Sequence, residues 1–347
     1  MSRRTTGLLK VAMSALHFAG VDRLLSRLTG GVGAIFMLHR VRPRTERGLD
    51  ATRGLEITPE FLDRTIRLVV ARGFDVLSLD DAHARICEGD FDRPFASFTF
   101  DLGFRDCRDF AAPVFSRHGL PFAVYVATDY VDGIGDLWWV KLEMVIAANE
   151  AVDLRIDGVE TRLEAATRSE KENAFDRIYQ WLRSLPEAGA RSVVADLGWR
   201  YGIETSGLCR DLVLGWDELR DLAADPLVTI GAQTRRHLAL GRLTRAEARL
   251  EMEESLQRLE HELGRRIRHF SFPYGDDASA GLREFELAYE LGLATAVTAC
   301  QGLVRTRHAL GTLGLPRVPL NGDFQSPRYV KVMLSGASER MRLGTNV

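Results

Sequence analysis

The sequence predicts an α/β protein whose strands and helices alternate around a distorted (β/α) barrel of about seven parallel strands. Two observations lead to this prediction. Short apolar runs alternate with helical patterns over most of the 347 residues. Polar residues recur at the carboxyl ends of the predicted strands, and in a barrel all of these ends share one face. We count seven or eight strands, which fit a barrel better than an open sheet.

The composition is that of an ordinary globular chain, with 46% hydrophobic and 27% charged residues. The 46 basic and 48 acidic residues give a formal charge of −2, so the total charge indicates no nucleic-acid partner. The four cysteines show neither CxxC spacing nor a paired framework: Cys87, Cys107, Cys209 and Cys300. This usage favours free thiols in a reducing compartment.

Residues 1–30 are predicted to form an N-terminal helical segment. A basic pair before apolar residues is typical of an export signal, but Lys10, His17, Asp22 and Arg23 interrupt the apolar pattern. We expect an amphipathic helix that packs on the domain, with peripheral contact to a membrane surface as the alternative. No transmembrane segment is expected, and the cytoplasm is the expected location.

The predicted barrel domain covers residues 31–325. Its first strand is the continuous apolar run 32–41. A helix follows, with Thr58 as N-cap, Pro59 at its first position and Gly73 just past its end. The alternation then continues with a strand and helix over 74–86, a strand at 95–101, a helix at 106–118 closed by Gly119, and a strand at 122–128.

The region 131–211 breaks this alternation and is predicted to be a helical insertion. It contains an apolar helical run at 137–152, a strand-like segment at 154–160 and charged helical segments. Beyond it, strands are expected within 226–234, 267–275, 294–302 and 315–320, and helices within 244–264 and 279–292. Residues 326–347 are expected to form a C-terminal tail.

Several polar residues fall at or just after the predicted strand ends: His39, Asp101, Thr128, Gln233, Thr234, His237, Pro273 and Tyr274. Each one alone is more typical of a turn or a cap. Their recurrence at equivalent positions predicts a site at the barrel mouth.

Six segments resemble, in order, the polysaccharide deacetylases of the NodB-homology, carbohydrate esterase type. They are FTFDLGFRD, GWDELRDLA, IGAQTRRHLAL, RHFSFPYGD, TAVTACQG and LPRVPLNG, and the resemblance extends over about residues 34–322. It implies a distorted barrel that removes acetyl groups, on nitrogen or oxygen, from an acetylated glycan or oligosaccharide.

The resemblance also implies a divalent metal, zinc or similar, that activates water, with a carboxylate as general base. Asp101 matches the catalytic base and His237 matches one metal ligand. Leu102 and Gln233 occupy the other two ligand positions. Leucine has no donor atom and a carboxamide is a poor zinc ligand, so we expect the metal site to be lost or much weakened.

The substrate-binding residues implied by the resemblance are His39, Thr234, Pro273, Tyr274 and Arg317. A structural ion pair is an equal alternative for Arg317, and Pro273–Tyr274 is also typical of a simple turn. Three hypotheses stay open: a deacetylase with a modified metal site, a glycan-binding barrel without hydrolysis, and a scaffold that uses 137–152 as an interface. All depend on Asp101 and His237 facing each other across a sugar-sized opening. The sequence gives no oligomeric state.

Overall fold

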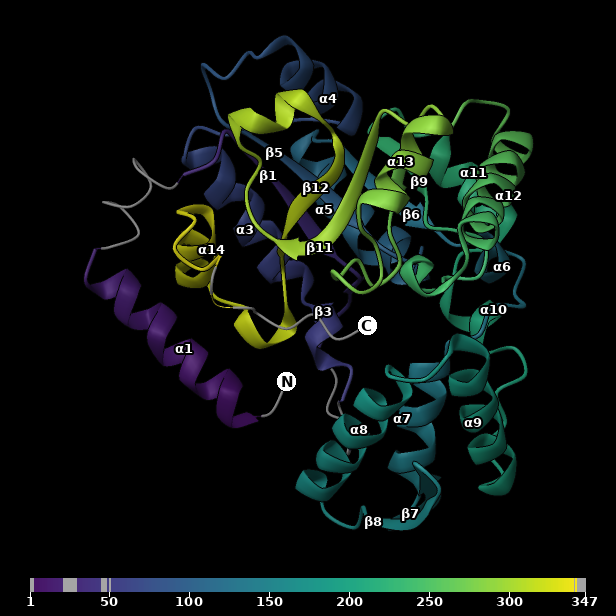
Figure 1. The fold of residues 1–347 in the computed structure, drawn as a ribbon. Helices are drawn as coiled ribbons and strands as arrows, with labels where there is room; N and C mark the ends of the chain where they lie inside the picture. Colours follow the sequence, from purple (N-terminus) through teal and green to yellow (C-terminus); the bar gives the residue numbers. More distant parts are fainter. Residues whose placement is uncertain (1–2, 21–29, 45–48, 50, 340, 342–347) are drawn as a thin grey trace.

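Seven parallel strands close into a barrel in the computed structural model, which describes residues 3–20, 30–44, 49, 51–339 and 341 (Figure 1). The strand order is β1-β12-β11-β10-β9-β6-β5, and β5 pairs with β1 to complete the circle. The short β4 (Asp75–Val76) adds an eighth strand beside β5. The barrel strands are β1 (Gly33–Leu38), β5 (Phe95–Phe100), β6 (Phe122–Val126), β9 (Val228–Ala232), β10 (His269–Ser271), β11 (Thr295–Gln301) and β12 (Leu313–Pro319). The predicted barrel is therefore confirmed.

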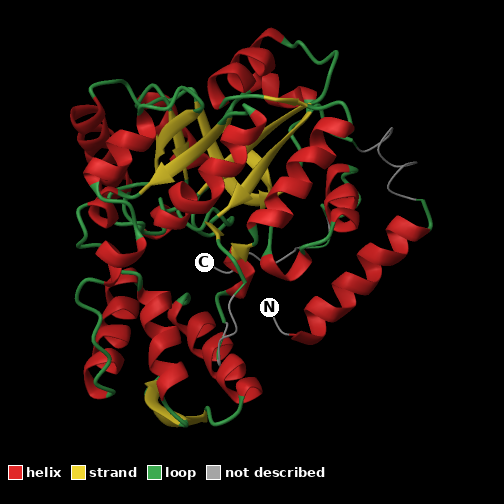
Figure 2. Ribbon diagram, turned by 180° about the vertical axis from the view of Figure 1, so that it is seen from behind, coloured by secondary structure: helices red, strands yellow, loops and turns green. Residues whose placement is uncertain are grey.

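Helices cover the outside of the barrel: α3 (Pro59–Ala71), α4 (Leu79–Glu88), α5 (Ala112–His118), α11 (Trp216–Ala223), α12 (Arg245–Leu263) and α13 (Leu282–Glu290). Figure 2 shows the strands (yellow) inside and the helices (red) around them. The predicted cap of α3 is present, because the Thr58 side chain accepts from the Phe61 N–H at 3.2 Å. The helix predicted over 106–118 begins as a π-helical turn, η2 (Cys107–Ala111), before α5.

The first predicted strand is interrupted at His39. β1 ends at Leu38, and the chain continues as β2 (Arg40–Val41), which pairs with β3 (Glu56–Ile57) in a separate small sheet. The Arg40 guanidinium bonds the Asp106 carboxylate at 2.6 Å. This ion pair anchors the chain just after the barrel mouth.

The insertion forms a lobe on one side of the barrel, drawn in teal in Figure 1. It consists of α7 (Trp138–Ala148), β7 (Ala151–Ile156), β8 (Val159–Glu164), α8 (Arg168–Leu182), α9 (Glu187–Arg200) and α10 (Leu208–Leu212). The strand-like segment is a hairpin, and its turn residues Asp157 and Gly158 have φ values of 49° and 82°. The apolar core of the lobe continues into the barrel mouth, where it includes Leu102 and Tyr274. Insertion and mouth thus share one packed cluster.

The two ends of the described chain lie together on the barrel surface. The expected N-terminal helix is present as α1 (Arg3–Phe18), and it packs against α14 (Pro327–Leu334). The expected tail therefore begins with a packed helix, in which Val330, Val332 and Met333 are buried. Parts of both expected terminal segments, 21–29 and 342–347, lie outside the described residues. None of the helices in the described ranges is both long and apolar enough to cross a bilayer.

Candidate active site

The barrel mouth brings most of the predicted site residues onto one small cavity. It is lined by Met37, His39, Asp101, Gln233, His237, Phe272, Tyr274, Ala299 and Arg317. Asp101 and His237 therefore face the same space, as the sequence predicted. The cavity volume is only about 10 Å³, which is room for about one water molecule. Among the residues that the structure describes, side chains fill this point, and the expected sugar-sized opening is not found there.

Asp101 is held by a buried guanidinium. Arg317 projects from β12 and donates to the two carboxylate oxygens of Asp101 at 2.8 and 2.7 Å. It also donates to the hydroxyls of Thr99 (3.2 Å) and Ser271 (3.1 Å) and to the carbonyl of Thr298 (2.8 Å). The five N–H groups of the guanidinium match these five contacts. This geometry favours the ion-pair alternative for Arg317 over substrate contact.

The pair controls ionisation at the mouth. Burial opposes the charge on Asp101, but the charge and hydrogen bonds of Arg317 outweigh it and hold the pKa of Asp101 below its ordinary value. The His39 Nε2 atom lies 4.0 Å from the Asp101 Oδ2 atom. Burial lowers the pKa of His39 to about 4, despite the nearby carboxylate. At neutral pH the mouth therefore holds a carboxylate, a guanidinium and a neutral imidazole.

His237 lies in an aromatic surround. The distances from its ring centroid to those of Tyr274, Trp139 and Tyr130 are 4.9, 5.9 and 6.0 Å. Its buried Nδ1 atom has no hydrogen-bond partner among the described residues. Burial, reinforced by the charge of Arg191, lowers the pKa of His237 to about 3. The predicted metal ligand is thus a neutral imidazole in apolar packing.

The two replaced ligand positions have structural roles. Leu102 is fully buried, and its backbone N–H donates to the Gln233 Oε1 atom at 2.8 Å. Gln233 thereby stabilises the turn after β5 instead of offering a free oxygen. Within the described ranges, no group of three His, Cys, Asp or Glu side chains is placed to hold a metal ion. With Asp101 paired to Arg317, the described residues of the mouth offer two imidazoles, His39 and His237, and no third ligand, and this set does not fit zinc, which takes three protein ligands in catalytic sites.

The backbone at the mouth is strained. Leu102, Thr234, His237 and Tyr274 have φ values of 73°, 64°, 57° and 60°. Only one other non-glycine residue in the described chain, Asp157, shares this left-handed conformation. The conformation costs roughly 1–2 kcal/mol per residue and concentrates at functional sites. The main chain after these strands thus has the left-handed conformation that is common at functional sites.

Three further predicted residues, Thr234, Pro273 and Tyr274, are buried at or next to the mouth. The Thr234 hydroxyl accepts from the His237 N–H at 2.9 Å, and Thr234 is fully buried. Pro273 is buried in the turn after β10 and does not line the cavity. The Tyr274 hydroxyl accepts from the Trp138 Nε1 atom at 3.1 Å, and the Arg183 guanidinium lies 3.7 Å from the Tyr274 ring centroid. Side chains from α7 and from the end of α8 therefore cover Tyr274.

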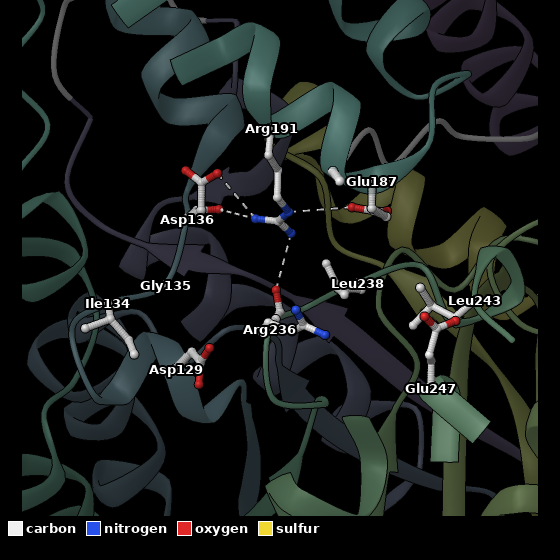
Figure 3. A pocket seen from close by; sticks show the side chains of 11 residues that line it. Asp129, Ile134, Gly135, Asp136, Glu187, Arg191, Arg236, Leu238, Leu243 and Glu247 are labelled. Atoms are coloured by element: carbon white, nitrogen blue, oxygen red, sulfur yellow. Dashed lines mark hydrogen bonds and ion pairs between the residues drawn. The ribbon is translucent and has the colours of Figure 1, made fainter. Parts of the chain in front are cut away.

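A larger cavity of about 410 Å³ lies beside the mouth (Figure 3). It is formed by the loops after β6 and β9 together with α9, and is lined by Asp129, Ile134, Gly135, Asp136, Glu187, Ala188, Arg191, Arg236, Leu238, Leu243 and Glu247. The Arg191 guanidinium donates to the backbone carbonyls of Asp136 (3.2 Å), Arg236 (3.3 Å) and His237 (3.5 Å). Sequence reasoning did not identify this cavity, since its walls come from segments with no common motif.

These features define an α/β-barrel protein with an acid, two imidazoles and an arginine at the carboxyl ends of its strands. The profile of the polysaccharide deacetylase family matches residues 88–294, more than half of the chain. The chain belongs to the polysaccharide deacetylase family.

Solved structures are similar in fold. The Streptococcus pyogenes deacetylase PplD, in complex with acetate, is 14% identical with a TM-score of 0.56, over 87% of this chain and 97% of that one. IcaB from Ammonifex degensii is 14% identical with a TM-score of 0.54, over 88% and 98%. A polysaccharide deacetylase from Bacillus cereus is 12% identical with a TM-score of 0.54, over 87% and 68%. No curated protein sequence matches this chain.

Proposed function

We propose that this chain is a glycan-binding member of the polysaccharide deacetylase family that does not hydrolyse acetyl groups at the barrel mouth. The observation that carries this proposal is the mouth cavity, which has room for about one water, together with Leu102 and Gln233 at two of the metal-ligand positions. A general base must reach both its proton donor and the substrate. Arg317 leaves a lone pair on each oxygen of Asp101, but an acetylated sugar has no space beside the carboxylate.

Hydrolysis with a modified metal site is the activity that the family implies. It would require ligands at positions 102 and 233, where the side chains are an aliphatic group and an engaged carboxamide. It would also require displacement of the aromatic side chains around His237. Both requirements count against it.

The glycan is proposed to bind in the 410 Å³ cavity beside the mouth. This volume falls in the range of small-ligand sites, about 300–1,000 Å³. The carboxylates of Glu187 and Glu247 provide acceptors for sugar hydroxyls, and the Arg236 guanidinium provides donors. Leu238 and Leu243 offer apolar surface for the C–H face of a sugar ring or an acetyl methyl group.

The test is a titration with N-acetylglucosamine oligomers by calorimetry, with acetate release measured in the same samples. We expect saturable binding and no acetate. Ala188→Phe places a ring in the cavity and should weaken binding at least tenfold. Ala195→Phe is the matched control, because Ala195 is exposed on the same helix but does not line the cavity.

Three results would overturn the proposal in different ways. Catalytic acetate release would establish a hydrolase. Unchanged binding by the Ala188→Phe variant would place the glycan elsewhere. No binding of any oligomer would favour the scaffold alternative.

A further inference from the structure

The N-terminal helix α1 has apolar side chains on two opposite faces. Leu8, Val11 and Phe18 are 72%, 69% and 77% exposed. At 3.6 residues per turn, these three positions fall within about 80° of one another. Leu9, Met13 and Leu16 lie on the other side of the helix and pack on the barrel core. A surface helix of a globular protein normally has one apolar stripe, and the second stripe here is unexplained by the fold.

The inner stripe fixes α1 to the domain, so the outer stripe faces away from it. Met13 is completely buried in the main core cluster, and the Lys10 ammonium group lies 5.8 Å from the Phe324 ring centroid. In both Figure 1 and Figure 2, α1 lies at the periphery of the molecule beside α14. No other described segment lies on its outer side in either view.

The charge of this segment is opposite to that of the whole chain. Residues 1–20 include Arg3, Arg4 and Lys10 and contain no aspartate or glutamate, whereas the complete chain has a formal charge of −2. A second copy of α1 would bring like charges together across the apolar stripe. An anionic lipid surface would attract these basic residues instead.

We propose that α1 binds the surface of an anionic phospholipid bilayer, with Leu8, Val11 and Phe18 inserted at the boundary between headgroups and acyl chains. An apolar face combined with basic residues is the pattern of helices that lie in the membrane plane. The 16 residues of α1 are fewer than the roughly 20 that a spanning helix needs. The barrel is thereby held at the lipid surface through the helix that also packs on α14. This inference does not depend on the proposed glycan site.

The test is co-sedimentation of the full chain with sucrose-loaded vesicles of phosphatidylcholine containing 30% phosphatidylglycerol, and with pure phosphatidylcholine vesicles. We expect sedimentation with the anionic vesicles that decreases in 0.5 M salt. The L8Q/F18Q variant should lose at least tenfold in partitioning. The R3Q/R4Q variant should lose on the order of tenfold at low salt, with little effect in high salt.

The matched control is L282Q/L310Q, which removes two leucines that are 80% and 94% exposed elsewhere on the surface. It should partition like the unmodified chain. Unfolding temperatures of all variants should agree, because the substituted apolar side chains are exposed. Equal partitioning of L8Q/F18Q and the unmodified chain would overturn the inference, as would the absence of binding to anionic vesicles. A lipid-free dimer that L8Q/F18Q dissociates would also overturn it, since a second copy would then cover the stripe.

Discussion

Arg317 on β12 and Asp101 at the end of β5 form a bidentate ion pair inside the barrel, with N–O distances of 2.8 and 2.7 Å. The exposed fractions of the two residues are 1% and 3%. The pair connects β12 and β5, the two neighbours of β1 in the barrel. It also places a permanent positive charge next to the carboxylate at the position of the family's catalytic base. Its consequences for stability and chemistry are measurable.

Removal of Arg317 should destabilise the fold strongly. The Arg317→Met variant leaves the Asp101 charge buried without its partner, which typically costs about 3–5 kcal/mol. The double variant D101L/R317M should recover part of this loss, since no buried charge remains. Free energies of unfolding in urea measure both effects.

The control for this prediction is Arg162→Met, which breaks an exposed pair with Asp153. It should cost little by comparison, because water and salt screen an exposed pair. A loss of similar size for Arg317→Met would show that the buried pair is not the main support of the mouth.

Restoration of both ligand positions should create a metal site. The variant L102D/Q233H supplies a carboxylate and an imidazole next to His237, whose Nδ1 atom has no partner among the described residues. We expect zinc binding at micromolar or tighter concentrations, measured by calorimetry and by metal analysis after dialysis. Adding His237→Ala to this variant should abolish zinc binding. If L102D/Q233H folds and stays free of zinc, the three positions do not share the geometry inferred from the mouth.

Acidification should weaken the fold between about pH 6.5 and pH 4. The pKa values of His39 and His237 are lowered from 6.5 to about 4 and about 3, so the unfolded chain takes up protons in this range that the folded chain does not. Each pKa unit corresponds to about 1.4 kcal/mol, so a few kcal/mol can be lost per imidazole. Asp101 also loses stabilisation on acidification, but only at lower pH, because its pKa is lowered and the unfolded carboxyl takes up its proton only near pH 4 and below.

Urea unfolding at pH 7, 6, 5 and 4.5 measures this dependence. The His237→Asn variant should show a smaller decrease in unfolding free energy, and asparagine tolerates the left-handed backbone at this position. His261→Asn serves as the control on an exposed side chain. The same slope in all three proteins would contradict the prediction.

The hydrogen bond from Trp138 to Tyr274 should couple the insertion to the mouth. Trp138→Phe and Tyr274→Phe each remove this bond of 3.1 Å, and the lost bond itself is worth about 1 kcal/mol. A double-mutant cycle in urea should give a coupling energy of about that size. Additive losses would mean that the bond contributes nothing beyond the packing of each ring.

The sequence predicted the barrel and the convergence of Asp101 with His237 because both follow from local patterns: apolar runs of strand length, and polar residues at their carboxyl ends. It also allowed the ion-pair alternative for Arg317. It did not predict the filled mouth. Two of the side chains that fill it, Tyr274 and His237, pack against Trp138 and Trp139 of a distant insertion, which the apolar pattern of 137–152 identified as helical but could not orient.

Other differences have similar causes. The helix α14 lies in the segment expected as a tail. It has only eight residues, too few to be stable as an isolated helix, and packing against α1 and α3 stabilises it. The role of Gln233 as acceptor for the Leu102 N–H depends on the ends of β5 and β9, which lie on either side of β6 and are 131 positions apart in the chain. Neither long-range contact has a signature in residue spacing.

The left-handed residues at the strand ends have a consequence for engineering. Leu102, Thr234, His237 and Tyr274 hold the chain in a trace that most side chains disfavour. The main chain at these turns already has a conformation that is common at functional sites. Catalytic side chains can therefore be introduced here by substitution, without a change of the backbone. A designer would begin with the required backbone and would need to enlarge the cavity that side chains now fill.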